Sequence, residues 1–168
     1  LLFAGITEAY EHEGEDRESM ALPEQQDELI AAVCRANPKT AVCLINGTPV
    51  EMDAWLEQSA AVLECWYPGQ ESGHAIAALL AGDVTPSGKL PATFPRKFAH
   101  APSAPSYPGK DGKVLFNEGI FLGYRGYEKN GTEPLFPFGF GLSYTSFSYD
   151  GLQVDSGELV QLTSRQGP

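Results

Sequence analysis

Residues 40–45, TAVCLI, form a short uninterrupted apolar run, and the turn sequence Asn46-Gly47-Thr48-Pro49 follows it directly. An apolar run of this length between turn signals is typical of a central strand of a parallel sheet, because both faces of such a strand are buried. Similar runs stand before and after it, at residues 1–4 (LLFA) and 60–66 (AAVLECW). The three runs predict three strands.

Helical patterns separate and follow these runs. The first pattern starts near Pro23, stops at Asn37-Pro38 and has apolar residues at helical spacing, namely Leu29, Ile30, Val33 and Ala36. A short helix is expected over 52–58, and a longer one over 72–81 with Gly82 as its C-cap. Strands that alternate with helices predict an α/β fold, here a layered sandwich with a mainly parallel sheet.

The loops at the carboxyl ends of the three strands are the predicted functional edge, because ligands of such sheets bind there. These loops are residues 5–22, 46–50 and 67–71. The first of them, called the acidic loop below, contains the sequence EHEGEDR at residues 11–17. Two interpretations of this run stay open from the residues alone, a solvated acidic surface and a carboxylic acid used for proton transfer.

The proton-transfer interpretation has a physical basis. Neighbouring carboxylates raise one another's pKa, so a Glu with an ordinary pKa of about 4.3 could shift toward about 6, as a general acid requires. Gly14 would let a ligand approach the backbone, and Arg17 could hold a nearby carboxylate in place.

Composition excludes several function classes. The 168 residues carry 22 acidic and 11 basic side chains, a formal net charge of −11, which disfavours nucleic-acid and anionic-membrane partners. The sequence contains no apolar run long enough to span a bilayer, no phosphate-binding loop and no GxSxG nucleophile motif. Its three histidines are dispersed, so neither a metal site nor a cofactor is expected. Cys34, Cys43 and Cys65 read as buried thiols, which together with the lack of a signal peptide favours the cytoplasm.

The second half of the chain has a different composition and is rich in glycine and aromatic residues. Residues 99–113 are expected to be a linker or surface loop, and residues 121–128 (FLGYRGYE) alternate in part and predict a strand. The Pro/Gly-rich stretch 134–144 predicts a coil whose aromatic rings pack on a neighbour. Alternation over 147–154 predicts the first strand of a new domain.

Five motifs, in order, resemble glycoside hydrolase family 3, the β-glucosidase family. They are residues 10–28 (YEHEGEDRESMALPEQQDE), 46–50 (NGTPV), 66–73 (WYPGQESG), 82–95 (GDVTPSGKLPATFP) and 136–145 (FPFGFGLSYT). The resemblance covers roughly residues 1–154. It implies that residues 1–98 are part of the family's α/β sandwich, that 99–146 complete it as a loop and junction, and that 147–168 begin a truncated fibronectin-III-like domain. Glu15 departs from the family pattern, which often has an aromatic residue there.

The resemblance also implies a function, that of a retaining, exo-acting β-glycosidase that hydrolyses terminal β-linked glucosyl residues. Retention needs two carboxyl groups about 5–5.5 Å apart. Glu13 matches the family's general acid/base, with Glu11 as the alternative, and Asp16 and Arg17 match the motif as support for the loop. Trp66, at a strand end, is a candidate sugar contact, although core packing explains it equally well.

No position here matches the nucleophile, which the family carries in an N-terminal barrel. The barrel of the parent protein is therefore an expected partner, together with a β-glucoside or oligosaccharide substrate. An incomplete sheet would leave an exposed edge and invite homo-oligomers. The alternative function is a non-catalytic module that binds carbohydrate or packs on the barrel. A flavodoxin-like nucleotide binder is disfavoured by the missing phosphate loop.

Overall fold

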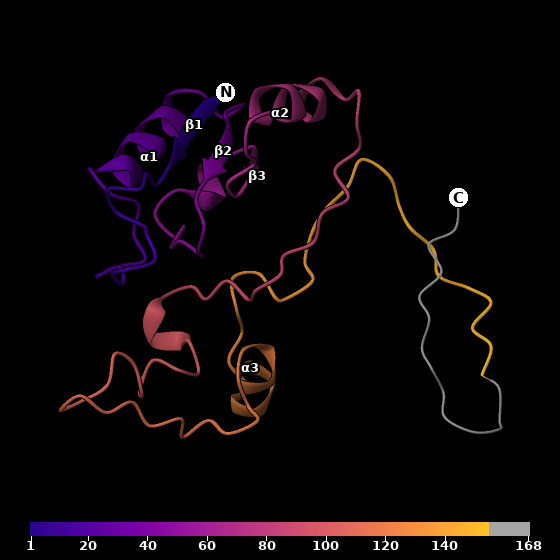
Figure 1. Cartoon of the computed structure of the whole chain (residues 1–168). Coiled ribbons are helices and arrows are strands. Elements are labelled where there is room, and N and C mark those ends of the chain that lie inside the picture. Colours follow the sequence, from indigo (N-terminus) through magenta and orange to yellow (C-terminus); the bar gives the residue numbers. More distant parts are fainter. Residues whose placement is uncertain (155–168) are drawn as a thin grey trace.

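A three-stranded parallel sheet organises the first half of the chain. The computed structural model describes residues 1–154, and in it β1 (Leu2–Gly5), β2 (Ala41–Ile45) and β3 (Ala61–Glu64) pair in the order β1-β2-β3 (Figure 1). Leu2 lies opposite Val42, and Ala41 lies opposite Ala61. The predicted parallel α/β sheet is confirmed, with strand ends within two residues of the expected ones.

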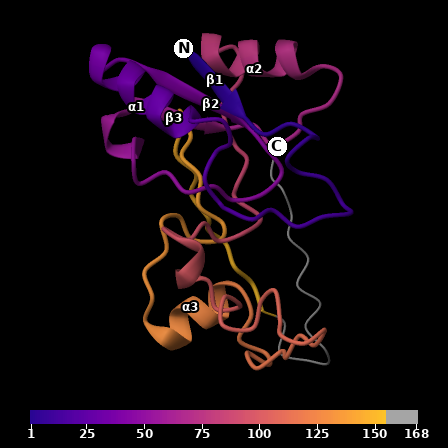
Figure 2. The ribbon, with the colours of Figure 1, turned by 90° about the vertical axis from the view of Figure 1, so that its left-hand side faces the viewer.

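Two helices belong to this sheet. The first, α1 (Gln26–Ala36), links β1 to β2, and α2 (Ser72–Ala81) follows β3. Both views place the strands between α1 and α2 (Figures 1 and 2). The bounds of α2 agree with the sequence prediction, and Gly82 closes this helix in the left-handed conformation at φ 83°.

The core lies on one face of the central strand. Val42 and Leu44 of β2 pack there in a cluster with Ile30 of α1 and with Met52 and Trp55 of the following connection. Each of these five side chains is at most 2% exposed. Because β2 is covered here and Cys43 on its other face is also fully buried, the continuous apolar run of residues 40–45 is explained.

Helix α1 corrects two details of the prediction. It begins at Gln26 rather than at Pro23, because Glu24 and Gln25 adopt left-handed backbone conformations that precede the first turn. Its buried face consists of Ile30, Ala31 and Cys34, whereas Leu29 is exposed. The inward face is therefore rotated by about one residue from the expected stripe.

The connection between β2 and β3 is less helical than predicted. Only η1 (Leu56–Gln58), a short 3-10 helix, forms within residues 52–58. Met52 and Trp55 both point into the core at a spacing of three residues, which suits the tighter 3-10 turn. The indole Nε1 of Trp55 also donates to Asp27 Oδ1 of α1 at 2.7 Å, so the connection is tied to the helix above it.

The aromatic stretch near the end pairs with an earlier segment. Backbone hydrogen bonds join Phe94 to Leu135 and Phe136, and Leu90 to Gly139 and Phe140. The Phe94 ring meets Phe136 edge to face at 6.3 Å between centroids. The prediction of a coil that packs its rings on a neighbour is confirmed. These two paired segments link the sheet to a second body that contains η2 (Phe98–His100) and α3 (Tyr124–Asn130) (Figure 1).

The predicted strand over residues 121–128 is wrong, because helix α3 (Tyr124–Asn130) forms there. Tyr124 and Tyr127 stand three residues apart, a helical spacing, and only Tyr127 is buried. Gly131 is the C-cap of this helix and adopts the left-handed conformation at φ 62°. Gly126 is required by close approach, since a Cβ there would lie 2.5 Å from the Phe121 carbonyl oxygen.

The strand predicted over residues 147–154 does not form, because no other segment among residues 1–154 pairs with it. Phe147 and Tyr149 are exposed at 54% and 94%. The remainder of the predicted fibronectin-III-like segment, residues 155–168, lies outside the described residues.

Candidate functional site

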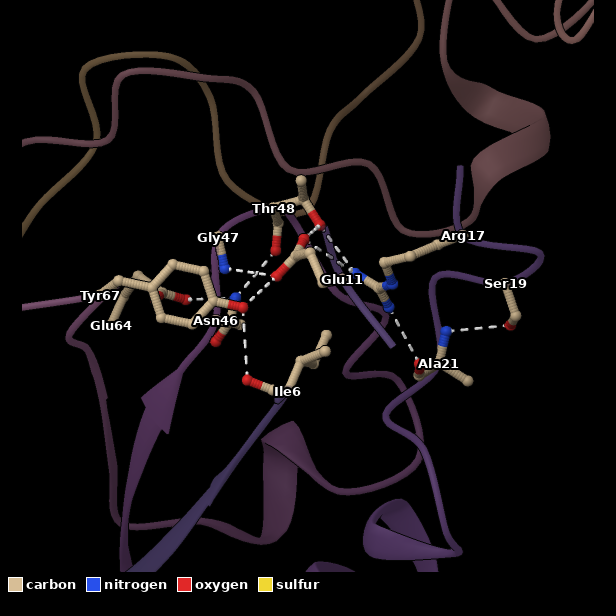
Figure 3. A network of polar contacts seen from close by, with 10 residues as sticks. All are labelled: Ile6, Glu11, Arg17, Ser19, Ala21, Asn46, Gly47, Thr48, Glu64 and Tyr67. Carbon is tan, nitrogen blue, oxygen red and sulfur yellow. Dashed lines mark hydrogen bonds and ion pairs between the residues drawn. The ribbon is translucent and has the colours of Figure 1, made fainter. Parts of the chain in front are cut away.

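Three loops from three strand ends meet at one carboxylate, that of Glu11 (Figure 3). Its Oε2 accepts hydrogen bonds from the Gly47 backbone N–H at 2.7 Å and from the Tyr67 hydroxyl at 2.6 Å. Its Oε1 accepts a hydrogen bond from the Thr48 hydroxyl. Glu11 follows β1, Gly47 and Thr48 follow β2, and Tyr67 follows β3. The convergence of these loops, predicted from the parallel sheet, is confirmed.

Arg17 completes this group of residues, called the Glu11 cluster below (Glu11, Arg17, Gly47, Thr48 and Tyr67). Its Nη1 donates to Thr48 Oγ1 at 2.7 Å and lies 3.8 Å from Glu11 Oε1, while Nη2 donates to the Ala21 carbonyl at 3.0 Å. The Arg17 and Glu11 side chains are only 14% and 12% exposed. Arg17 therefore joins the acidic loop to Thr48 and lies beside the Glu11 carboxylate.

Gly47 is the residue that makes this packing possible. A Cβ at position 47 would lie 2.7 Å from Tyr67 Cε2 and 3.1 Å from Glu11 Oε2. Any larger residue would push the tyrosine ring or the carboxylate away from the backbone N–H. The β2 loop thus needs glycine at this point for the two side chains to reach it.

The electrostatics of Glu11 are opposite to the sequence expectation for the acidic loop. Burial alone would raise the Glu11 pKa, but the hydrogen bonds from Thr48, Tyr67 and Gly47 and the Arg17 charge together lower it below its ordinary value. Glu11 is thus held as an anion, and the expected upward shift toward a general acid does not occur at this residue. Partial burial of the phenol and its hydrogen bond to the Glu11 carboxylate raise the pKa of Tyr67 to about 12.

Glu13 occupies a different environment at the exposed tip of the same loop. In the described part of the chain, no hydrogen bond or ion pair involves its carboxylate. Its neighbours are engaged, because His12 Nε2 lies 3.8 Å from Glu15 Oε2 and the Asp16 carboxylate lies near the Tyr107 hydroxyl. The nearby Asp16 carboxylate raises the pKa of Tyr107. The Glu13 carboxylate is therefore free, whereas residues on both sides of it make contacts.

An open cleft of about 1170 Å³ lies between the acidic loop and the second body. It is lined by Glu11, Glu15, Asp16 and Arg17 on one side and by residues such as Tyr107 and Tyr124 on the other. Glu13 is not among the residues that line it, so its carboxylate faces outward from this part of the chain.

A second carboxyl group, missed by the sequence analysis, lies next to the Glu11 cluster. Glu64 is the last residue of β3, and burial raises its pKa to about 7. Its Oε1 accepts a hydrogen bond from the Trp66 backbone N–H at 3.0 Å, and its Oε2 lies 3.5 Å from Asn46 Nδ2. A charged residue within the apolar run of residues 60–66 was the available signal for it.

Trp66 lies at the predicted strand end, but its ring packs inward. It meets the buried Phe94 edge to face at 5.8 Å and contacts the hydrophobic core. Core packing therefore explains a tryptophan at this position, and the sugar contact remains a prediction.

In residues 1–154, His, Cys, Asp and Glu side chains nowhere gather in groups of three or more that could hold a metal ion. No helix in that same range is long and apolar enough to cross a membrane. Cys34 and Cys43 are buried and Cys65 is half-buried, and all three are free thiols.

Comparison with known sequences connects this arrangement to a family of enzymes. The chain is 48% identical over 159 residues to thermostable beta-glucosidase B of Acetivibrio thermocellus, covering 95% of this chain but 21% of that protein. It is also 48% identical over 155 residues to a probable beta-glucosidase I of Aspergillus niger, covering 92% and 19% of the two chains. The chain thus spans about a fifth of the length of these relatives.

Solved structures show the same relation. A beta-glucosidase from Kluyveromyces marxianus in complex with glucose matches with a TM-score of 0.83 and 46% identity, over 86% of this chain and 17% of that one. A GH3 beta-glucosidase from Bifidobacterium adolescentis matches with a TM-score of 0.83 and 43% identity, over 89% and 22%. The model of the glycosyl hydrolase family 3 C-terminal domain matches residues 1–124, and the chain therefore belongs to glycoside hydrolase family 3.

Proposed function

We propose that this chain supplies the general acid/base of a retaining, exo-acting β-glucosidase, and that Glu13 is the group that transfers the proton. The observation that carries the proposal is the contrast between two glutamates in one loop. Glu11 is held as an anion by hydrogen bonds, whereas Glu13 stands exposed and unengaged two residues further along. A general acid must reach the leaving oxygen with a free carboxyl group, and Glu13 meets this requirement.

The chemistry takes two steps in the retaining mechanism. In the first, Glu13 donates its proton to the glycosidic oxygen as the bond from that oxygen to the anomeric carbon breaks, and a nucleophilic carboxylate bonds to that carbon. In the second, the Glu13 carboxylate removes a proton from water, and the resulting hydroxide displaces the nucleophile. The nucleophile would come from a part of the longer protein beyond this chain, which spans only about a fifth of its relatives.

The other site residues act through the loop. Glu11 and Arg17 would fix its base, and Asp16 would fix its outer side through Tyr107. Gly14, exposed next to Glu13, leaves space for a sugar to approach the backbone. The outward position of Glu13 is suited to a substrate that lies between this loop and another domain.

The test is the Glu13→Gln variant of the full-length protein that contains this chain. Hydrolysis of glucosides with poor leaving groups should fall by about 10²–10⁴-fold, since they need protonation, and that of activated aryl glucosides should fall much less. Glu8→Gln, also exposed in the same loop (residues 5–22), is the matched control and should retain activity on both substrates. An equal loss on both kinds of substrate in Glu13→Gln would count against the acid role.

The alternative function, a non-catalytic sugar-binding module, draws support from the open cleft with aromatic residues on its wall. Tyr124 and Phe138 stack there with ring centroids 5.3 Å apart, and both are partly exposed. Calorimetric binding of glucose by a full-length protein that hydrolyses no β-glucoside would favour this alternative.

A further inference from the structure

Glu64 is the last residue of β3, and its carboxyl group touches two of the three loops that form the Glu11 cluster. One oxygen accepts the Trp66 backbone N–H at 3.0 Å, in the loop after β3. The other lies 3.5 Å from the Asn46 amide, whose Nδ2 also donates to the Thr48 carbonyl at 2.8 Å, in the loop after β2. Asn46 is fully buried, so this amide has a fixed position.

The turn after Glu64 is conformationally unusual. Trp66 has φ 53°, a left-handed backbone conformation that L-residues with large side chains disfavour. Two contacts hold it there. The Glu64 carboxyl group binds its N–H, and its ring packs against Phe94. The strained conformation therefore depends on a side chain two residues earlier in the chain.

This turn determines where Tyr67 points. The hydroxyl of Tyr67 donates to Glu11 at 2.6 Å and lies 3.3 Å from the Ile6 carbonyl oxygen at the end of β1. A relaxed Trp66 backbone would change the direction of the next residue and move this hydroxyl away from the carboxylate. Figure 3 shows Glu64, Asn46 and Tyr67 on the same side of the Glu11 carboxylate.

We propose that Glu64 is a positioning residue that keeps Tyr67 and Thr48 on Glu11 and thereby holds the acidic loop in its working conformation. The kinetic consequence rests on the proposed function of that loop, whereas the effect on the loop itself does not. Burial raises the pKa of Glu64 to about 7, so about half of the Glu64 carboxyl groups are neutral at pH 7 and most are neutral below it. The Glu11 carboxylate and the Cys65 thiol are the titratable groups that face it, and its neutral form adds no second charge beside Glu11.

The experiment compares variants of the full-length protein by hydrogen exchange and by kinetics. Glu64→Ala should raise amide exchange in peptides covering residues 6–22 by about tenfold or more, because the Trp66 N–H loses its acceptor. Glu64→Gln keeps an acceptor oxygen and should restore most of the protection. Glu57→Ala, an exposed glutamate in η1, is the matched control and should leave exchange unchanged.

Kinetics provide a readout that general destabilisation would not reproduce. In folded Glu64→Ala, kcat for a β-glucoside should fall by about tenfold with KM nearly unchanged, and Glu64→Gln should recover it, because Glu64 acts through the position of the acidic loop. Tyr67→Phe, which removes only a hydroxyl, should loosen the same peptides and lower kcat in the same way. It tests the same connection if Glu64→Ala does not fold.

Each outcome has one meaning. Unchanged exchange over residues 6–22 in both Glu64→Ala and Tyr67→Phe would overturn the positioning role. Loosened peptides together with a rise in KM and an unchanged kcat would also overturn it. Loosened peptides in a full-length protein that hydrolyses no β-glucoside would support the positioning role and refute the proposed function.

Discussion

Replacing Glu11 with alanine is the most direct perturbation of the site, because it removes the group on which three loops converge. Hydrogen bonds to a charged acceptor are worth about 1.5–3 kcal/mol each, and three donors bind this carboxylate. The freed donors of Thr48 and Tyr67 would regain bonds to water, since Tyr67 is 52% exposed. We therefore expect a net loss of about 3 kcal/mol in the local free energy of opening, well below the sum of the three bonds.

Hydrogen exchange of the Gly47 amide measures this loss, because that N–H donates directly to Glu11. A change of about 3 kcal/mol corresponds to exchange about 150-fold faster when exchange reports the opening equilibrium. Glu13→Ala, two residues away and without a bonded carboxylate, should leave the Gly47 amide as it is. A change of less than about threefold in Glu11→Ala would refute the view that this carboxylate holds the loops together.

Lowering the pH perturbs the same group, because it protonates the Glu11 carboxylate. The folded-state pKa of Glu11 is lowered from its ordinary value of 4.5. Its stabilisation is therefore fully present above about pH 4.5 and is lost as the pH falls through the folded pKa. Gly47 protection should decline in that range in the unsubstituted protein and should be low and insensitive to pH in Glu11→Ala, after correction for intrinsic exchange.

Three further outcomes are expected. Gly5→Ala should destabilise the sheet by more than about 3 kcal/mol, because its Cβ would lie 2.0 Å from the Ile45 carbonyl oxygen. Gly73→Ala is the control and should cost no stability, because a Cβ at this position in α2 would meet open space. Thermal melting of both variants measures the difference. Phe3→Lys should reduce self-association of the 168-residue chain, because Phe3 is 54% exposed on edge strand β1. Equal association of the variant and the unsubstituted chain in light scattering would contradict this expectation. Glu64 has a folded pKa raised from 4.5 to about 7, so stability should fall as the pH rises between these values; urea unfolding at pH 5 and pH 8 should show that Glu64→Gln removes this loss.

The architecture of the first half was predictable because its signals are local and strong. The run of residues 40–45 is apolar throughout because β2 is buried on both faces, and Gly82 marks the end of α2 because only glycine enters the left-handed cap easily. The rule that parallel strands bring their carboxyl ends together then placed the acidic loop beside residues 46–50 and 67–71. These predictions needed no knowledge of side-chain contacts.

The details of the site were not predictable in the same way. Glu11 and Glu13 are two acids in one polar run, and their difference depends on a glycine and a tyrosine that reach Glu11 from 36 and 56 residues away. Glu64 looked like an interruption of a strand, and only its contacts with Trp66 and Asn46 reveal its place. Helix α3 was misread because the partial alternation of residues 121–128 outweighed the three-residue spacing of its tyrosines.

The double attachment of the acidic loop bears on how the protein can be altered. Glu11 and Arg17 both bind Thr48, so the residues at the two ends of segment 12–16 are attached to the same side chain. Changes within residues 12–16 need not disturb these two attachments, so the length and sequence of this segment can be varied while the sheet keeps its shape. Libraries confined to residues 12 and 15, with Glu11, Glu13, Gly14, Asp16 and Arg17 retained, therefore offer a route to new substrate preferences at little risk to folding.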